Sequence, residues 1–390
     1  MSTNEKQHQL SQIKTYHFQE LISFIDTGAI TLTEMINAGL SNYTVEDINQ
    51  HYASKKQAPV NENEVVALCN KIEKGEYRAE KIKNLLISGT ITEAQLLQHT
   101  TLGQDLINKV QNYQKRVTPF ESWSDLPPLE KNRTDLYFFG QPGSGKSCIL
   151  ASIFYYLHHN GMLMNSSQNP RGNVYKDQLI NEISVGILPD STQRDGVNYI
   201  PLELKNHINT AYKHPLNFIE MSGELFDDAY ESGISDQNLA AKNYLDNKNK
   251  KLIYFVLDYK MENRSMNSGA TSQTNKAEQV LALLDEFGTL KNTDGIFIVI
   301  SKSDKFPEGV NRNEYAVEFL KKRYLNLYNN IKDKQEQYGF EIKLYPYSIG
   351  EVKLQDLLIS FDMQSPSEIV EDIMDYTFVS QKPWYQRIFG

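Results

Sequence analysis

The spacing of apolar residues changes about a third of the way along the chain. Residues 1–115 carry short apolar clusters at helical spacing, separated by glycines and polar turns. From Asp135 onward, strand-length apolar runs such as "LIYFVL" and "GIFIVI" alternate with longer amphipathic segments. This alternation is typical of an α/β fold with a mostly parallel sheet and helices on both faces. The pattern therefore predicts a small all-α region followed by an α/β domain.

The N-terminal region contains an internal repeat, with copies in residues 14–54 and 76–115. "LISFIDTGAITLTEMINAGL" and "IKNLLISGTITEAQLLQHTT" both consist of a helix, a glycine, Ile-Thr and a second helix. Gly28 and Gly89 suit the left-handed position that ends a helix. The repeat predicts small helical packing units or, alternatively, a module that docks a partner. Two capping boxes are expected to begin the second helices: Thr31 with Glu34, and Thr92 with Gln95.

Composition and local texture set the remaining boundaries. Residues 116–133 are rich in proline and polar residues and predict a linker between the helical region, 1–115, and the α/β domain, 134–378. Residues 379–390 are expected to form a C-terminal tail.

Charge and cysteine usage exclude several classes of protein. The formal net charge of −9 disfavours general binding to nucleic acid or anionic lipid. Two cysteines far apart, Cys69 and Cys148, provide no disulfide framework and fit a reducing compartment. The N-terminus is polar, and no apolar run approaches the ~20 residues of a membrane span. A cytoplasmic protein without a membrane span is therefore expected.

The strongest chemical signal is a phosphate-binding loop between a predicted strand and a predicted helix. Its glycines let backbone N–H groups turn toward phosphate oxygens, and the helix adds its positive end. Lys146 is expected to reach the β- and γ-phosphates, and Ser147 to ligate magnesium. Cys148 follows, and we expect it to be a small buried residue beside the nucleotide. The loop matches G-x-x-x-x-G-K-[ST] through Gly140, Gln141, Pro142, Gly143, Ser144, Gly145, Lys146 and Ser147.

Two acids compete for the second metal position. Asp258 ends the apolar run "KLIYFVLD", but the glutamate expected directly after it in many ATPases is replaced by Tyr259. Glu220 ends the run "NFIE" and is followed by Gly223 in an E-x-x-G pattern. Glu220 is therefore the favoured metal acid, with Asp258 at the end of the next strand and without metal contact.

Two further loops follow predicted strands. Ser301-Lys302-Ser303-Asp304 resembles the N/T-K-x-D guanine motif of GTPases, with a serine in place of the usual Asn or Thr. The resemblance implies that the Asp304 carboxylate accepts both the N1–H and the N2–H of guanine and that the lysine stem packs on the base. Ser348 and Ile349, followed by glycine, end the run "EIKLYPYSIG" and resemble the short S-A-K/L loop of the same family. The resemblance implies that a backbone N–H of this loop contacts the guanine oxygen.

The four motifs, in this order, resemble those of a TRAFAC-class GTPase domain over residues 134–376. The resemblance implies a Ras-like P-loop NTPase fold that binds GTP or GDP with Mg²⁺. Segments 161–190 and 261–275 are insertions relative to a minimal Ras-like domain. The wording of the phosphate loop, "GILPDST" and "NFIEMSGELFDD" most resembles the bacterial double-GTPase branch, which is linked to conflict and signalling systems.

The same resemblance assigns the switch and hydrolysis residues. Thr192 is the expected first-switch threonine and third metal ligand beside Ser147 and Glu220, with Ser191 as the alternative. The N–H of Gly223 is expected to touch the γ-phosphate. Glu224 stands where Ras-like enzymes use glutamine, and a carboxylate near phosphate predicts slow hydrolysis. Lys146, Thr192 and Glu224 form the candidate catalytic set, while Arg171 and Arg194 are weaker candidates for a charge-neutralising arginine.

These residues predict a GTP-binding molecular switch, a slow Mg²⁺-dependent GTPase. Protein partners are expected at the switch loops and the N-terminal repeats, no nucleic acid is expected, and dimerisation is left open. The alternatives are a scaffold that binds nucleotide without turnover and a P-loop ATPase that uses Asp258.

Overall fold

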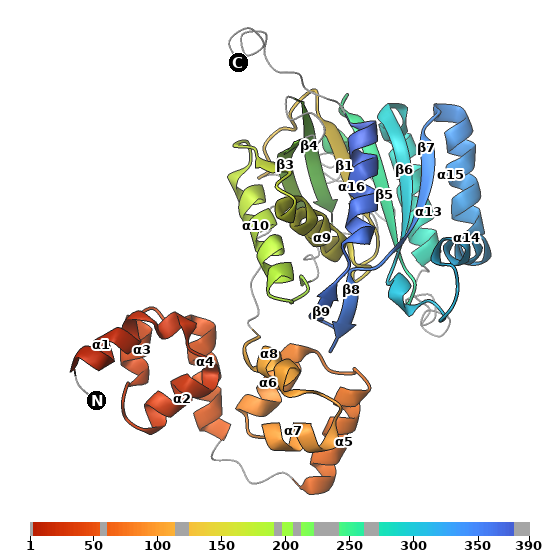
Figure 1. The fold of residues 1–390 in the computed structure, drawn as a ribbon. Helices are drawn as coiled ribbons and strands as arrows, with labels where there is room; N and C mark the ends of the chain where they lie inside the picture. Colours follow the sequence, from red (N-terminus) through yellow and green to blue (C-terminus); the bar gives the residue numbers. More distant parts are fainter. Residues whose placement is uncertain are drawn as a thin grey trace. The chain divides into compact units, whose positions relative to one another are not determined.

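The chain divides into two compact units. In Figure 1 the helices of the first unit are drawn from red to orange, and the strands and helices of the second from yellow-green to blue. The first comprises Met1–Val117 and Val352–Leu357, and the second Thr118–Glu351 and Leu358–Gly390. Within the described ranges, no helix is long and apolar enough to cross a membrane. This computed structural model describes residues 3–54, 61–113, 125–190, 197–205, 212–221, 242–260 and 273–377.

The first unit is built from short helices. Its core includes the buried Leu21, Met35 and Ile48 of the first repeat copy, joined by Ile87 of the second. The helices are α1 (Thr3–Ser11), η1 (Ile13–Thr15), α2 (Phe18–Asp26), α3 (Leu32–Asn37), α4 (Asn42–Ser54), α5 (Glu62–Glu73), α6 (Ala79–Ile87), α7 (Glu93–His99) and α8 (Gln104–Gln111).

The local geometry predicted for the repeat is confirmed. Gly28 and Gly89 have left-handed φ angles of 69° and 67°. Both capping boxes form, because each threonine hydroxyl accepts the backbone N–H three residues on and each threonine N–H donates back to the side chain there. The return bonds measure 2.9 Å for Glu34 and 2.8 Å for Gln95. Local sequence therefore determines where α3 and α7 begin.

The segment Val352–Leu357 completes the first unit. Asp356 Oδ1 accepts the backbone N–H of Ala79, the first residue of α6, at 3.0 Å, and Gln355 Nε2 donates to the carbonyl of Gly75 at 2.8 Å. The N-cap of α6, Arg78, makes no side-chain capping bond. Asp356 therefore supplies the cap from a distant part of the chain.

The second unit contains a seven-stranded sheet in the order β2-β3-β4-β1-β5-β6-β7. β3 runs antiparallel to both of its neighbours, and the other pairs are parallel. The predicted mostly parallel α/β fold is confirmed. The strands of the sheet are β1 (Thr134–Phe139), β2 (Leu163–Asn165), β3 (Val197–Lys205), β4 (Lys213–Met221), β5 (Lys250–Asp258), β6 (Thr293–Ser301) and β7 (Glu341–Tyr347). A separate two-stranded sheet is formed by β8 (Gly350–Lys353) and β9 (Leu357–Phe361), whose tip, Val352–Leu357, belongs to the first unit.

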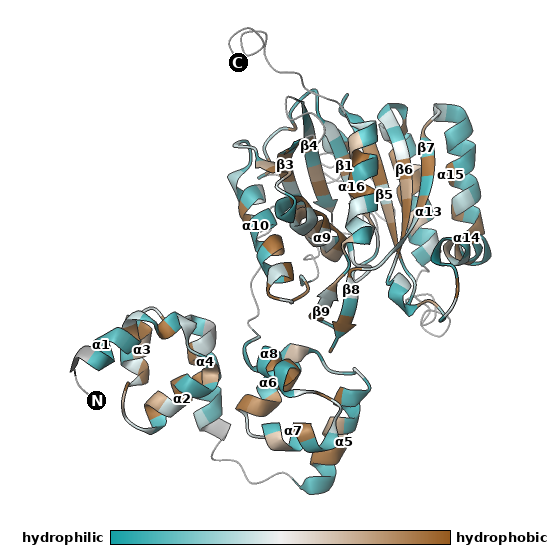
Figure 2. Cartoon of the chain, in the orientation of Figure 1, coloured by the Kyte–Doolittle hydropathy of each residue, from teal (hydrophilic) through white to brown (hydrophobic). Residues whose placement is uncertain are grey.

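Helices cover both faces of this sheet because successive strand residues point to opposite sides. Phe138 stacks on Tyr254 and lies near Phe218, which meets Phe154 of α9 edge-on. Tyr137 faces the other way, into a core shared with α13, α14 and α15. Figure 2 shows β5 and β6 largely brown and the outer helix α15 largely teal. The helices are α9 (Lys146–His159), α10 (Pro170–Ser184), α13 (Gln273–Glu286), η3 (Thr289–Asn292), η4 (Ser303–Lys305), α14 (Arg312–Arg323), α15 (Leu325–Tyr338) and α16 (Gln364–Tyr376).

Part of the predicted linker packs on the α/β unit instead of running free. Leu126 and Leu129 lie against the core on the α13 side of the sheet. Arg133 Nη1 donates to the carbonyls of Leu202, at 3.0 Å, and Leu216, at 3.3 Å. The predicted linker has few apolar residues among many polar ones, and these show neither strand nor helix periodicity. The sequence therefore could not predict that Leu126 and Leu129 pack against the sheet.

Candidate functional site

The phosphate loop joins β1 to α9 and depends on two glycines. Gly145 has φ 100° and is the N-cap of α9, a conformation that disfavours any residue with a Cβ. A Cβ on Gly140 would lie 2.5 Å from the carbonyl oxygen of Val256 on β5. The loop therefore passes directly over β5, with the positive end of α9 behind it.

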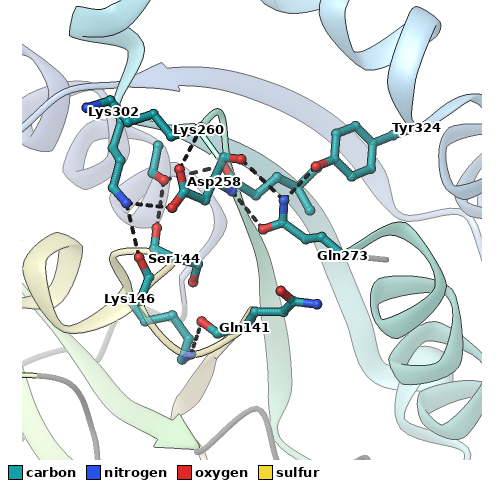
Figure 3. Close-up of polar contacts among 11 residues, drawn as sticks. Gln141, Ser144, Lys146, Asp258, Lys260, Gln273, Lys302 and Tyr324 are labelled. Atoms are coloured by element: carbon teal, nitrogen blue, oxygen red, sulfur yellow. Dashed lines mark hydrogen bonds and ion pairs between the residues drawn. The ribbon is translucent and has the colours of Figure 1, made fainter. Parts of the chain in front are cut away.

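Lys146 lies across this loop. Its Nζ donates to the carbonyls of Gly140, at 2.6 Å, and Gln141, at 3.2 Å (Figure 3). The ammonium group is thus held at the loop from which it is expected to reach phosphate.

Cys148 differs from its prediction, since it is partly exposed. On α9, the residues that face the sheet recur at helical spacing through Ile149, Leu150 and Phe154. Cys148 lies outside that face, so the prediction that it is buried is wrong.

The S-K-x-D segment is bound to the phosphate loop. Ser301 Oγ donates to the carbonyl of Ser144 at 2.6 Å, and Lys302 Nζ donates to the carbonyl of Gly143 at 3.2 Å. Lys302 has a φ of 62°, a left-handed conformation that is uncommon for a residue with a side chain. The end of β6 and the phosphate loop therefore form one connected structure.

Asp258 anchors this arrangement. Its buried carboxylate accepts Lys302 Nζ at 2.5 Å and the backbone N–H of Lys260 at 2.8 Å. Gln273, the first residue of α13, accepts the N–H of Asp258 at 2.8 Å and donates to Tyr324 at 2.6 Å, as Figure 3 shows. The sequence predicted that Asp258 ends its strand but did not predict its ion pair with Lys302.

Glu220 lies beside the phosphate-loop serine. Ser147 Oγ donates to Glu220 Oε1 at 2.6 Å, and the glutamate is completely buried. Its other oxygen, Oε2, accepts Tyr175 Oη at 2.6 Å and Asn198 Nδ2 at 3.2 Å. Burial, followed by the charge of Glu220, raises the pKa of Tyr175 well above its ordinary value, so the phenol stays a donor.

The donor set around Ser147 and Glu220 fits magnesium. Over the described residues, no three His, Cys, Asp or Glu side chains gather closely enough to hold a metal. Magnesium is usually bound by one or two carboxylates together with water and phosphate oxygens, so a hydroxyl and a single carboxylate are sufficient protein ligands. Softer metals that need imidazole or thiolate ligands are a poorer match.

The base-side loops follow neighbouring strands, because Ser301 of β6 pairs with Tyr347 of β7. The carboxylate of Asp304 forms an ion pair with Lys305 at 2.8 Å and retains 23% side-chain exposure. Ser348 is buried and its Oγ accepts the N–H of Gly350 at 3.0 Å, while the carbonyl of Ile349 accepts the N–H of Asp362, also at 3.0 Å. Sheet topology thus brings Asp304 and Ile349 to the same edge of the sheet.

Several predicted residues lie outside the described ranges. They are Thr192 and its alternative Ser191, Arg194, Gly223 and Glu224. Arg171 is described and lies exposed in the first turn of α10. Sequence reasoning missed Tyr175 and Asn198, because neither belongs to a motif of fixed spacing.

No family model and no curated protein matches the chain. Similar solved structures include nucleolar GTP-binding protein 1 from Plasmodium falciparum, 13% identical over 64% of this chain and 90% of its own, with a TM-score of 0.32. Toc33 from Arabidopsis thaliana is 14% identical over 63% of this chain and 84% of its own, with a TM-score of 0.33. NFeoB from S. thermophilus is 14% identical over 63% of each chain, with a TM-score of 0.24. Sequence identities and TM-scores this low carry no argument about function.

The class of the α/β unit follows from its own coordinates. A parallel strand, a G-x-x-x-x-G-K-[ST] loop and a helix that begins at Lys146 occur in that order beside the central strands of the sheet. The chain therefore has a P-loop NTPase fold.

Proposed function

We propose that the chain is a GTP-binding molecular switch. The observation that carries the proposal is the attachment of the S-K-x-D segment to the phosphate loop, through Ser301 to Ser144 and Lys302 to Gly143. This attachment puts the residue that would recognise the base, Asp304, at a defined position relative to the phosphate loop. A guanine-specific site needs both ends of the nucleotide held in one frame.

Guanine recognition is assigned to the loops after β6 and β7. The carboxylate of Asp304 would accept two N–H groups of guanine, an arrangement that adenine cannot provide. The stem of Lys302 would pack on the base while its ammonium stays with Asp258. A backbone N–H in the Ser348–Ile349 loop would donate to the guanine oxygen.

The phosphates and their metal are assigned to the opposite end of the site. Backbone N–H groups of residues 140–147 and Lys146 would bind the phosphate oxygens. Ser147 and Glu220 would hold Mg²⁺, together with Thr192. A bound Mg²⁺ neutralises phosphate charge. Ser147 Oγ donates to Glu220 Oε1, so the two proposed metal ligands lie side by side.

Hydrolysis is proposed to be slow. Glu224 would orient water, but its negative charge beside phosphate opposes fast turnover. Gly223 and Thr192 would sense the γ-phosphate, and its loss would release their loops to change partners. Protein partners at the switch loops and the helical repeats, dimerisation and a cytoplasmic location belong to the same proposal. Placement in the double-GTPase branch is supported by the wording of the sequence alone.

The ATPase alternative is less well supported by the geometry. Asp258 is already bonded to Lys302 and Lys260, whereas the phosphate-loop serine bonds to Glu220. In a P-loop ATPase, the carboxylate that helps to hold Mg²⁺ lies next to the phosphate-loop serine.

Titration of the full chain with fluorescent GTP and ATP analogues in Mg²⁺ tests the proposal. We expect GTP to bind at least about tenfold more tightly than ATP, and the preference to disappear in Asp304→Asn, because an amide N–H would face the donors of guanine. Lys146→Ala should abolish both binding and phosphate release. Equal or preferential binding of ATP by the wild-type chain would overturn the assignment.

A further inference from the structure

We propose that Tyr175 and Asn198 are positioning residues that adapt the magnesium site to a glutamate at position 220. This inference rests on the proposed nucleotide function and identifies how that site is built. Asn198 and Tyr175 both bond to the carboxylate of Glu220, and Tyr175 also lies beside Ser147.

The hydrogen bonds divide the carboxylate into two functionally different oxygens. Oε1 accepts Ser147 Oγ at 2.6 Å, on the phosphate side. Oε2 accepts Tyr175 Oη at 2.6 Å and Asn198 Nδ2 at 3.2 Å. Two donors on Oε2 fix the rotation of the carboxylate plane, so Oε1 stays directed at the serine. Such outer donors orient a ligating carboxylate and tune its affinity for metal.

Each donor is itself fixed by the fold. Asn198 lies directly opposite Glu220 in the antiparallel pairing of β3 and β4, so the two side chains share one face of the sheet. Tyr175 comes from α10, in the segment 161–190 that the resemblance to a Ras-like domain predicts to be an insertion.

The first turn of α10 is pinned against β3. Asn169 Nδ2 donates to the carbonyl oxygen of Tyr199 at 2.7 Å. A Cβ on Gly172 would lie 2.1 Å from the same oxygen, so only glycine allows this approach. Tyr175 lies one turn after Gly172 on α10, so the close packing of this turn on β3 brings its hydroxyl to Glu220.

The length of the acid explains why these donors are needed. Glutamate has one more methylene and one more rotatable bond than aspartate, so its carboxylate reaches farther and has more orientations to lose. A buried carboxylate also needs its lone pairs satisfied. The inserted helix and the unusual acid are therefore two parts of one feature.

The experiment measures the rate at which a fluorescent GDP analogue is released from the full chain. The Mg²⁺ concentration is varied from none, in EDTA, to saturating. The half-saturating Mg²⁺ concentration reports metal affinity, and the rate in EDTA reports structural damage. We expect Tyr175→Phe and Asn198→Ser each to raise the half-saturating Mg²⁺ concentration by about 10- to 100-fold. Release in EDTA should stay within about twofold of wild type.

Two further variants make the test specific. Tyr254→Phe is a matched control, because its hydroxyl is also buried but has no hydrogen-bond partner among the described residues. This variant should leave the Mg²⁺ dependence unchanged. In Glu220→Asp the shorter acid is withdrawn from the phenol, so adding Tyr175→Phe should change the half-saturating concentration by less than about threefold.

An unchanged Mg²⁺ dependence in Tyr175→Phe and Asn198→Ser, with wild-type binding intact, overturns this inference and leaves the proposed function standing. Faster release in EDTA to the same degree as in Mg²⁺ also overturns it, since the role is then structural. If Tyr175→Phe does not fold, Asn198→Ser decides alone. A wild-type chain that binds no guanine nucleotide overturns the proposed function and this inference with it.

Discussion

At the scale of single residues, the site depends on side chains that hold other side chains. Asp258 was expected only to end a strand, yet its buried carboxylate holds Lys302, which in turn bonds to the phosphate loop. Glu220 is held in a comparable way by residues from two other elements. Motifs identified the residues expected to touch the nucleotide, whereas their supports have no sequence signature.

Replacement of Asp258 by asparagine should weaken guanine-nucleotide binding about tenfold. The change removes the negative charge of the pair that holds Lys302 against the phosphate loop, a hydrogen bond between charged groups worth about 1.5–3 kcal/mol, and leaves only a weaker amide acceptor. Fluorescent-nucleotide titration measures the loss. Asp294→Asn is the control, because its ion pair with Lys250 at 2.7 Å is largely exposed and contributes little. An Asp258→Asn chain with wild-type affinity would show that the pair does not support the site.

At the scale of elements, a buried polar cluster lies where β1 and β5 begin, at the opposite edge from the phosphate loop. Asp135 accepts Asn217 at 2.7 Å, Asn247 at 2.8 Å and Asn249 at 3.0 Å. Lys251 pairs in register with Asp135 and donates to the carbonyls of Asn247 and Asn249, at 2.6 and 2.8 Å. Burial raises the pKa of Asp135 and lowers that of Lys251 to about 8. The cluster satisfies its polar groups and fixes the register of these strands.

The lowered pKa of Lys251 predicts a stability difference at alkaline pH. Between about pH 8 and 10.5, Lys251 is protonated in the unfolded chain but neutral in the folded chain. The free energy of unfolding therefore rises with pH through this range and falls as the pH is lowered. The stability of the wild type relative to Lys251→Met should therefore rise by up to about 3 kcal/mol from pH 8 toward 10.5. Urea unfolding of both chains at pH 8, 9 and 10 measures this difference. Parallel pH profiles would contradict the assignment.

The strands could be predicted from the sequence, but the packing of the linker could not. The apolar runs before Gly140, after Pro215 and before Ser301 were all predicted to be strands, and the structure has β1, β4 and β6 there. Such runs are local signals, since burial on both faces selects continuous apolar residues. By contrast, the packing of residues 125–133 depends on the carbonyls of Leu202 and Leu216, far away in sequence.

At the scale of the whole molecule, the helical unit is not continuous in sequence. Val352–Leu357 belongs to it, although 234 residues lie between Val117 and Val352. Asp356 caps α6, whose own N-cap residue makes no capping bond. The repeat alone therefore does not define the complete unit.

Asp356→Ala should destabilise the first unit by about 1 kcal/mol, because the backbone N–H of Ala79 loses its acceptor. Hydrogen–deuterium exchange of peptides covering α6 should become faster, while those covering β5 stay protected. Asp105→Ala is the matched control, since this exposed acid in the first turn of α8 should have a smaller effect. Unchanged protection of α6 in Asp356→Ala would rule out the cap.

The sequence by itself determined the features that depend on neighbouring residues. These are the strands, the turns of the repeat, the phosphate loop and the S-K-x-D segment, because backbone conformation and burial of consecutive residues are local properties. Only the tertiary structure decided which acid meets Ser147, what holds that acid and what caps α6. Those contacts join residues separated by 73, 45 and 277 positions, and the order of strands and the path of the chain bring them together.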